Sequence, residues 1–332
     1  MTAHRDALLA LLADGRLHTG PALAARIGVS RAAVWKIVAE LRDAGIEVES
    51  LPRRGYRLPR ECELLDAAAI QRTAQAAGAP PLDLEVHASI DSTNRHLYDA
   101  PAPPVGTPRV AFAELQYAGR GRRGRAWLAP FGSGLTFSIA WTYADLPAQL
   151  PALGLAIGVA VVETLRAQGA RDAMLKWPND VVWQGRKLGG LLIQLKLEAG
   201  GAASVVVGIG LNLALPDAAR AGLASPGATT PGDLAEACGG RAPPRNALAG
   251  ALVAAACEAL ERFGREGYGP WASRWHALDA LAGRDVRVVQ SSGSVEGRAL
   301  GADTDGALRV EVAGRVERFH SGDVSLRPAE AP

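Results

Sequence analysis

Residues 119–127 read Gly119-Arg120-Gly121-Arg122-Arg123-Gly124-Arg125-Ala126-Trp127. Glycine lets the backbone approach a ligand closely, and arginine carries a fork of donors that matches carboxylate and phosphate oxygens. Four arginines interleaved with three glycines therefore favour an anion-binding loop. A solvated basic loop and a nucleic-acid-binding tail have the same composition, so this segment alone leaves both alternatives open.

Two predicted strands flank this segment. The strand from Arg109 to Gln116 runs into it and the strand from Leu135 to Thr142 leaves it, so residues 117–134 form one long loop. Loops of this length in compact domains are usually lids or binding loops. The position of the arginines thus favours a ligand site over a basic tail.

The composition is that of a globular protein with more than one domain. A length of 332 residues suggests two or three domains, and 48% hydrophobic with 21% charged residues excludes a disordered chain. Three scattered cysteines indicate neither a disulfide framework nor a zinc site. The longest uncharged apolar stretch, Leu146 to Val162, contains prolines and is shorter than the about 20 residues of a membrane span. We therefore expect a cytoplasmic protein without a membrane association.

Residues 1–62 are predicted to form a winged helix-turn-helix domain. Apolar residues recur at helical spacing in 4–13 and 20–26, and a third helix is predicted over 30–44 with one apolar face. Two short extended segments follow, Ile46 to Leu51 and Gly55 to Leu58. The apolar face of the third helix consists of Val34, Ile37, Val38 and Leu41.

A winged helix-turn-helix domain places its third helix in the major groove of DNA. A small helical domain that binds other proteins is the alternative. Trp35 on this helix either lies partly in the core or makes a base or phosphate contact, and we predict the core because an indole is largely apolar. The predicted DNA contacts are Ser30, Arg31, Ala32 and Lys36 on the helix, and Arg53 and Arg54 between the two extended segments.

The next segment links this domain to a pattern of alternating strands and helices. A helix is predicted over 64–77, and from residue 84 a strand runs to Ile90. It leads into Asp91-Ser92-Thr93-Asn94, whose side chains are typical of helix caps. Hydroxyl groups and helix N–H groups at such a turn can bind a polar ligand, and simple capping is the other interpretation.

Further along, Lys176-Trp177-Pro178-Asn179-Asp180 presents a cation, an amide and a carboxylate around a proline turn. A carboxylate and an amide beside a phosphate suit Mg²⁺, so Asp180 and Asn179 are the candidate metal ligands, and an ordinary β-turn is the alternative. Lys187 precedes a strand over 188–193 that is expected to pair with residues 204–210. Asn212 follows among apolar residues and needs hydrogen-bond partners if buried.

The rest of the chain is predicted to be helical and then extended. Residues 217–230 read as a loop, and helices are predicted over 231–238 and 245–266, with a further one carrying Trp271, Trp275 and Leu278. After Gly283, four short strands with glycine-rich turns predict a small SH3-like barrel.

Several of these motifs together carry a resemblance to a known family. Residues 119–127, 176–180, 91–94 and 186–192 occur in the order of the bifunctional biotin–protein ligases that also repress the biotin operon, and Ser30 to Ala33 with Gly55-Tyr56 resembles their N-terminal domain. The resemblance spans essentially the whole chain. It implies an α+β multidomain fold with a winged helix-turn-helix domain in 1–62, a mixed α/β catalytic domain of the biotin/lipoate-ligase type in 63–282 and an SH3-like β-barrel in 283–328.

The same resemblance implies roles for individual residues. The implied catalytic residues are Lys187, Arg122 and Asp180. The implied biotin contacts are Ser92, Thr93, Asn94, Gln116, Gly119, Arg120, Gly121, Arg122 and Lys187. The implied ATP and adenylate contacts are Arg120, Arg122, Arg125, Trp127, Lys176, Asn179, Asp180 and Asn212.

The activity that the resemblance implies is activation of biotin by ATP, with Mg²⁺, to biotinyl-AMP. Biotin is then transferred to a lysine of a biotin carboxyl carrier domain, and the adenylate-bound protein forms a homodimer that binds operator DNA. Two alternatives are ligation of lipoate and a repressor with a noncatalytic ligand-sensing domain. The sequence departs from the family pattern at Gln194, where an acid is expected, and at Trp35, which replaces a small polar residue.

Overall fold

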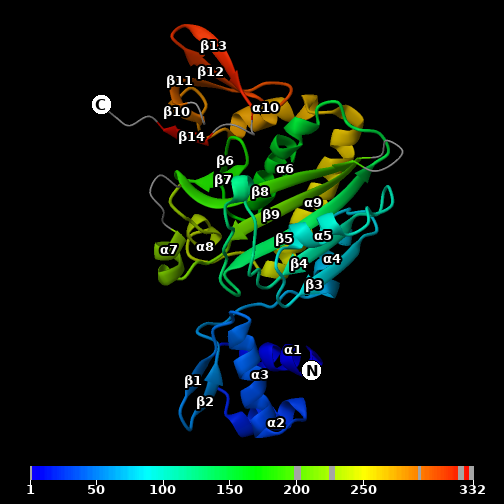
Figure 1. Cartoon of the computed structure of the whole chain (residues 1–332), viewed down its shortest axis with the longest axis vertical. Helices are drawn as coiled ribbons and strands as arrows, with labels where there is room; N and C mark the ends of the chain where they lie inside the picture. Colours follow the sequence, from blue (N-terminus) through cyan, green and yellow to red (C-terminus); the bar gives the residue numbers. More distant parts are fainter. Residues whose placement is uncertain (1, 198–202, 224–228, 291–292, 321–324, 329–332) are drawn as a thin grey trace.

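The computed structural model describes residues 2–197, 203–223, 229–290, 293–320 and 325–328. Three units follow one another along the long axis of the molecule (Figure 1). The N-terminal helical unit lies at one end, the large sheet with its helices lies in the middle, and a small C-terminal sheet lies at the other end. The predicted fold class, a helix-turn-helix domain before an α/β domain and a small β domain, is confirmed.

The N-terminal unit has its own hydrophobic core, made by the apolar faces of its three helices. The third helix begins after Ser30, whose hydroxyl accepts the Ala33 N–H at 3.1 Å. As predicted, Val34, Ile37, Val38 and Leu41 are buried. Its elements are α1 (Thr2–Leu12), α2 (Gly20–Ile27), α3 (Arg31–Asp43), β1 (Glu49–Leu51) and β2 (Gly55–Arg57).

Trp35 does not lie in this core, so that prediction was wrong. The side chain is 65% exposed because Val34 and Val38 occupy the apolar stripe of α3 and Trp35 lies about 100° around the helix from Val34. An indole on the outer face of α3 stands among the residues that were predicted to meet DNA.

The middle unit is built on a seven-stranded mixed sheet with the order β3-β4-β5-β9-β8-β7-β6. β3 and β4 are parallel and the other neighbours are antiparallel, including the predicted pair of β8 with β9. The strands are β3 (Asp83–His87), β4 (Arg109–Ala113), β5 (Gly134–Tyr143), β6 (Met174–Lys176), β7 (Asp180–Trp183), β8 (Arg186–Leu197) and β9 (Ala203–Asn212).

The two faces of the central strands β5 and β9 differ in chemistry. Alternate side chains point to opposite faces of a sheet. On one face, Phe137, Ile139 and Val207 belong to the main hydrophobic core. On the other face, β5 and β9 carry the small or polar residues Thr136, Ser138, Gly208 and Gly210. This second face is where a ligand has room to lie.

Helices cover the apolar face. α4 (Ala67–Ala76), α6 (Leu153–Ala167), α9 (Arg245–Glu266) and α10 (Gly269–Leu278) supply the core with residues such as Ile70, Ile157, Leu252 and Trp275. α5 (Thr93–Asp99) packs on the opposite face, where Leu97 meets Ala140 and Val206 (Figure 1). In the described part of the chain, only Leu150–Ala167 is long and apolar enough to cross a membrane, and 61% of that segment is buried inside the protein, as in a core helix.

Residues 217–230 contain a helix, α7 (Asp217–Leu223), where the sequence was predicted to form a loop. The alanines of this segment favour a helix, and the proline before it concealed that preference. Arg220 joins the helix to α8 (Leu234–Ala237) through ion pairs with Asp233 and Glu236. The part of the predicted loop in 224–228 lies outside the described residues.

The C-terminal unit is an antiparallel sheet with the order β13-β12-β11-β10-β14. Within the described residues β13 and β14 are its two edges, so the sheet is five-stranded and its closure into the predicted barrel is not seen. Val286, Val288 and Val310 join the main core of the middle unit. The strands are β10 (Asp285–Gln290), β11 (Gly293–Ala302), β12 (Leu308–Val312), β13 (Arg315–Phe319) and β14 (Ser325–Pro328).

Candidate functional site

A cavity lies on the polar face of the central sheet, between the N-terminus of α5, the basic loop and the turn after β6. All but two of the predicted small-molecule contacts line it. Those that line it are Ser92, Thr93, Asn94, Gln116, Arg120, Gly121, Arg122, Arg125, Trp127, Lys176, Asn179, Asp180 and Lys187. The structure therefore brings segments from five separate places in the sequence to one site.

The uncharged end of the cavity is built by the first turn of α5. Ser92 caps this helix, and its hydroxyl accepts the Arg95 N–H at 3.4 Å. The N–H and the hydroxyl of Thr93 both donate to Gln116 Oε1, at 2.7 and 3.1 Å, and the Thr93 hydroxyl lies 2.9 Å from the Ser138 hydroxyl. These bonds fix the position of the turn against β5.

Asn94 is the exception in this network. Its side chain is 4% exposed, and neither Oδ1 nor Nδ2 has a hydrogen-bond partner among the described residues. An unpaired buried amide costs free energy, on the order of 1–3 kcal/mol per group. Because Asn94 lines the cavity, its donor and its acceptor are placed to meet a polar, uncharged group of a ligand.

Glycines in β9 make room for the walls of the cavity. A Cβ at Gly210 would lie 2.5 Å from the Trp127 ring, and a Cβ at Gly208 would lie 3.1 Å from Asn94 Nδ2. The indole of Trp127 thus lies directly against the β9 backbone, as the glycines in this predicted strand suggested. Trp127 Nε1 is buried and has no partner among the described residues.

The other end of the cavity is cationic. Lys187 Nζ lies 2.6 Å from Asp180 Oδ1, and Arg122 Nη1 donates to Asn179 Oδ1 at 3.1 Å. Lys176 Nζ donates to the Thr229 hydroxyl at 3.0 Å. Burial lowers the pKa of Arg122 because the charged form is desolvated. An anion at this end of the cavity would stabilise these cations.

The basic loop has structure of its own. Arg122–Gly124 forms a 3₁₀ turn, with Arg123 at φ 56°. The Gly121 N–H donates to Arg125 O at 2.7 Å, and the Trp127 N–H donates to Gly119 O at 2.8 Å. These two backbone hydrogen bonds and the 3₁₀ turn give the basic loop a defined form.

The turn after β6 is held from the C-terminal unit. Trp177 is 2% exposed, and its Nε1 donates to Gly306 O at 3.0 Å. The Trp177–Pro178 peptide bond is cis. Asn179 Nδ2 donates to Leu191 O at 2.7 Å and so fixes the turn to β8. The polar residues of this turn are therefore positioned by buried contacts on both sides.

Gly119 and Asn212 are the two predicted ligand contacts outside the lining of the cavity. A Cβ at Gly119 would lie 2.3 Å from Trp127 O, so this glycine closes the loop. Asn212 is 4% exposed, and its Nδ2 donates to Lys187 O at 3.3 Å and Gly232 O at 2.9 Å. In this structure the partners of Asn212 are backbone carbonyls next to Lys187.

Three hydroxyl-bearing residues of the lining, Thr136, Ser138 and Thr229, were not among the predicted contacts. For two of them, Thr136 and Ser138, the sequence does contain a pattern that could have predicted a place in the site. Polar side chains at 136 and 138 alternate with apolar ones in a strand whose ten residues are all buried, which marks one face as a site face. Thr229 follows the undescribed residues 224–228 and has no comparable pattern.

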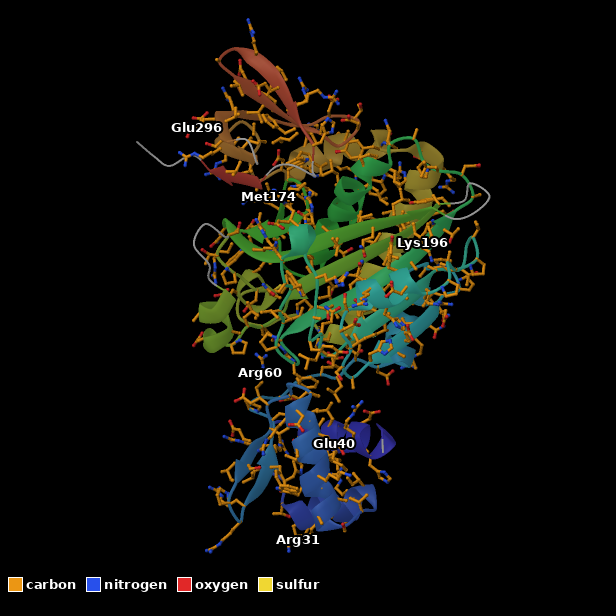
Figure 2. The ribbon with its side chains drawn as sticks, viewed as in Figure 1. Arg31, Glu40, Arg60, Met174, Lys196 and Glu296 are labelled. Carbon is orange, nitrogen blue, oxygen red and sulfur yellow. The ribbon has the colours of Figure 1, made fainter. Side chains whose placement is uncertain are left out.

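The predicted DNA contacts lie far from this cavity. All six are exposed. Ser30 caps α3, Arg31, Ala32 and Lys36 lie on α3, and Arg53 and Arg54 lie in the turn between β1 and β2. Figure 2 labels Arg31 at the end of the N-terminal unit away from the central sheet, whereas Arg60 lies at the junction of the two units. Arg60 Nη1 donates to Ala214 O there, at 2.6 Å.

A helix-turn-helix unit joined to an α/β unit with this cavity defines a ligase of the class that attaches small carboxylic acids to proteins. The model of the biotin/lipoate A/B protein ligase family matches residues 86–212. An HTH domain matches residues 4–57, and the biotin protein ligase C-terminal domain matches residues 282–327.

Whole proteins of this class are similar to most or nearly all of the chain. The bifunctional ligase/repressor BirA of Salmonella typhimurium is 40% identical, with 97% of each chain covered. The biotin–[acetyl-CoA-carboxylase] ligase of Mycobacterium tuberculosis is 34% identical over 78% of this chain and 95% of its own. The biotin protein ligase of Aquifex aeolicus, solved with biotin and ATP, has a TM-score of 0.61 at 26% identity and covers 74% of this chain and 99% of its own. The chain belongs to the family of bifunctional ligase/repressors named BirA.

Proposed function

We propose that this protein activates biotin with ATP and attaches it to a lysine of a biotin carboxyl carrier domain. The observation that carries the proposal is the division of one cavity into two ends. One end has the cations of Arg122 and Lys187, and the other has the buried, unpartnered amide of Asn94. Biotin has the matching halves, a carboxylate at one end and an uncharged ureido ring at the other.

In the first step a biotin carboxylate oxygen attacks the α-phosphorus of ATP. The new C–O–P linkage forms while the bond from the α-phosphorus to its bridging oxygen breaks, and pyrophosphate leaves with the electron pair. Both reactants are anions, so cations fixed at their meeting point lower the barrier. We assign this role to Lys187 and Arg122, and Asp180 holds Lys187 in position through their 2.6 Å contact.

In the second step the uncharged amine of the acceptor lysine attacks the acyl carbon of biotinyl-AMP. The amide bond forms, the bond to the phosphate oxygen breaks, AMP leaves with the electron pair and the nitrogen gives up a proton to solvent. Trp127 covers β9 at the cavity wall, and we propose that it packs against the adenine and keeps water from the adenylate. Arg120, Arg125 and Lys176 also line the cavity, and we assign them to the phosphates of ATP in the first step.

The Asn94 side chain favours biotin over lipoate. A ureido group offers both N–H donors and a carbonyl acceptor, whereas the dithiolane ring of lipoate offers neither. Only the ureido group can satisfy both Nδ2 and Oδ1 of Asn94. A site that hydrogen-bonds its substrate discriminates strongly against an analogue that lacks the hydrogen-bonding group.

ATP–pyrophosphate exchange with each acid tests this specificity. We expect exchange with biotin, and mass spectrometry of a biotin carboxyl carrier domain incubated with biotin and Mg-ATP should show one added biotinyl group. Exchange with lipoate alone would establish the lipoate alternative. Exchange with neither acid would establish the noncatalytic, ligand-sensing alternative.

We propose that Mg²⁺ enters as part of the Mg-ATP substrate. The predicted ligand atoms already face cations, since Asp180 Oδ1 contacts Lys187 and Asn179 Oδ1 accepts from Arg122. Mg²⁺ keeps several waters and binds phosphates with one or two carboxylates. Asp180 and Asn179 are therefore suited to contact a magnesium ion that the ATP phosphates hold. They are not suited to enclose the ion in a site made of protein ligands alone.

We also propose that the adenylate-bound protein dimerises in the cytoplasm and represses transcription through operator DNA. The exposed residues Arg31, Ala32 and Lys36 of α3 support this proposal, together with the exposed Arg53 and Arg54. Sedimentation with and without biotin and ATP tests dimerisation. An unchanged distribution between monomer and dimer would contradict the proposal that the adenylate causes the protein to dimerise.

Arg54→Ala should weaken operator binding at every salt concentration and reduce the slope of log affinity against log salt by roughly one.

A further inference from the structure

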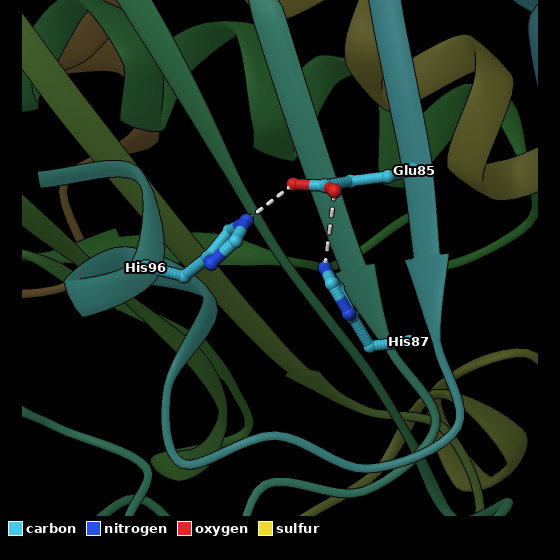
Figure 3. A group of neighbouring side chains, drawn as sticks. All are labelled: Glu85, His87 and His96. Carbon is cyan, nitrogen blue, oxygen red and sulfur yellow. Dashed lines mark hydrogen bonds and ion pairs between the residues drawn. The ribbon is translucent and has the colours of Figure 1, made fainter. Parts of the chain in front are cut away.

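A second polar cluster lies outside the ligand cavity, where β3 meets α5. Glu85 and His87 are two residues apart in β3 and therefore share one face of the strand. His96 comes from α5 and faces them. Figure 3 shows the Glu85 carboxylate between the two imidazoles. In the described parts of the chain, no other group of three His, Cys, Asp or Glu side chains has a spacing that suits a metal ion.

The distances within the cluster suit a small cation. Glu85 Oε1 lies 2.5 Å from His96 Nε2, and Glu85 Oε2 lies 3.4 Å from His87 Nε2. One donor atom from each of the three residues can be chosen so that all lie within 4.8 Å of one another. Ligands at about 2.0–2.2 Å from a tetrahedral Zn²⁺ are roughly 3.4 Å apart, so small movements of these side chains would bring the three donors to an ion.

The hydrogen bonding of the cluster is incomplete. His87 Nε2 is buried from solvent and has no hydrogen-bond partner among the described residues, although it lies within ion-pair distance of Glu85. A buried ring nitrogen without a partner is uncommon, and a bound ligand is one of its recognised explanations. The three side chains are about one quarter to two fifths exposed, so water can complete the coordination.

We propose that Glu85, His87 and His96 bind one divalent transition-metal ion of the zinc class. Imidazole nitrogens with one carboxylate select such ions over Mg²⁺ and Ca²⁺, which prefer oxygen ligands. The ion would join β3 to α5. His96 N–H donates to Ser92 O at 2.9 Å, so the ligand on α5 belongs to the same turn as the cavity residues Ser92 and Asn94.

Titration calorimetry of the chelator-treated full chain with Zn²⁺ tests the site. We expect one equivalent to bind, with an affinity that excess Mg²⁺ does not change. His87→Gln and His96→Gln should each weaken binding by at least roughly tenfold. The matched control is His18→Gln, since His18 also contacts a carboxylate, Asp14 Oδ1 at 2.9 Å, but belongs to no such triad among the described residues. This control should bind as the wild type does.

Two outcomes of the titration would overturn the proposal. One is wild-type protein that binds no Zn²⁺, and the other is equal binding by the wild type and the His87→Gln/His96→Gln double variant, which would place the ion elsewhere. Hydrogen exchange of the wild type gives an independent readout if a variant does not fold. Zn²⁺ should slow exchange of the amides of Thr93–Asp99, and unchanged exchange in protein that has bound Zn²⁺ contradicts the site.

Discussion

Lys187 illustrates how one side chain determines the chemistry of the cavity. Its ammonium is partnered by Asp180 in the structure and lies beside the predicted meeting point of the two anions. We predict that Lys187→Ala slows adenylate formation by roughly 10²-fold or more, the scale for losing one preorganised charge-stabilising group. Single-turnover formation of biotinyl-AMP measures this effect. Lys196→Ala, on the same strand but outside the cavity, is the control and should leave the rate unchanged. Equal rates for wild type and Lys187→Ala would remove Lys187 from the mechanism.

Asp279, at the end of α10, is a second informative residue, because it affects stability. It is 5% exposed, and burial raises its pKa from 3.8 to about 6. A carboxyl with a raised pKa binds its proton more tightly in the folded state, so folding is disfavoured as pH rises from 3.8 to 6. The full cost, up to about 3 kcal/mol, is present above pH 6.

We therefore predict that Asp279→Asn raises the melting temperature at pH 8 and that the gain shrinks as the pH falls below 6. The asparagine keeps the oxygen that accepts the Leu281 N–H at 2.9 Å. Calorimetric melts of wild type and variant between pH 8 and pH 5 measure the difference. The exposed Asp145→Asn serves as control. A gain that is the same at pH 5 and pH 8 would rule out the buried charge as its cause.

At the scale of elements, the basic loop depends on β9. The Trp127 ring lies so close to Gly210 that a Cβ there would approach it to 2.5 Å. We predict that Gly210→Ala displaces Trp127 and raises the KM for ATP by roughly tenfold, with little change in the melting temperature. Gly154→Ala is the matched control, because its Cβ would meet Ile193 at an ordinary 3.6 Å. An unchanged KM for ATP in Gly210→Ala would show that Trp127 does not contact the nucleotide.

The same loop also reaches the N-terminal unit. Phe131 packs against the core of that unit, and Gly132, at φ 68°, lies where a Cβ would be 2.8 Å from Cys62 Cβ. The C-terminal end of the loop 117–134 thus contacts the segment that connects the helix-turn-helix unit to the catalytic unit. A change in the loop on ligand binding has a direct physical route to the DNA-binding unit.

At the scale of the whole molecule, the two outer units are attached differently. The N-terminal unit has a separate core, whereas residues of the C-terminal sheet belong to the core of the middle unit. We propose domain boundaries at residues 62 and 282, where the Cys62 N–H donates to Ala13 O and the Gly283 N–H donates to Ala299 O. The C-terminal sheet is therefore expected to unfold together with the catalytic unit.

The bond from Trp177 Nε1 to Gly306 O tests this coupling. Trp177→Phe leaves the Gly306 carbonyl without its partner in a buried place, and we predict a loss of about 1–3 kcal/mol in the free energy of unfolding. Trp271→Phe is the matched control, because Trp271 is equally buried and its Nε1 has no partner among the described residues. Urea unfolding of both variants gives the comparison, and equal losses would show that the hydrogen bond contributes little.

Several local features of this protein follow from its sequence alone. The spacing of Val34, Ile37, Val38 and Leu41 predicted both the helix α3 and its buried face, because amphipathic periodicity is a local property. The glycine-arginine loop, the turn around Pro178 and the capping residues at Ser92 were recognised from their residue types, which are also local. These motifs together carry the family resemblance, and most residues of the candidate site were named from that resemblance.

Which distant segments meet depends on tertiary packing. The fold placed Ser138 beside Thr93 and Thr136 in the same cavity, left Asn94 without a partner among the described residues and directed Asn212 to backbone carbonyls. These outcomes depend on packing between residues far apart in the chain, and a local pattern carries no information about which neighbour will occupy a given space.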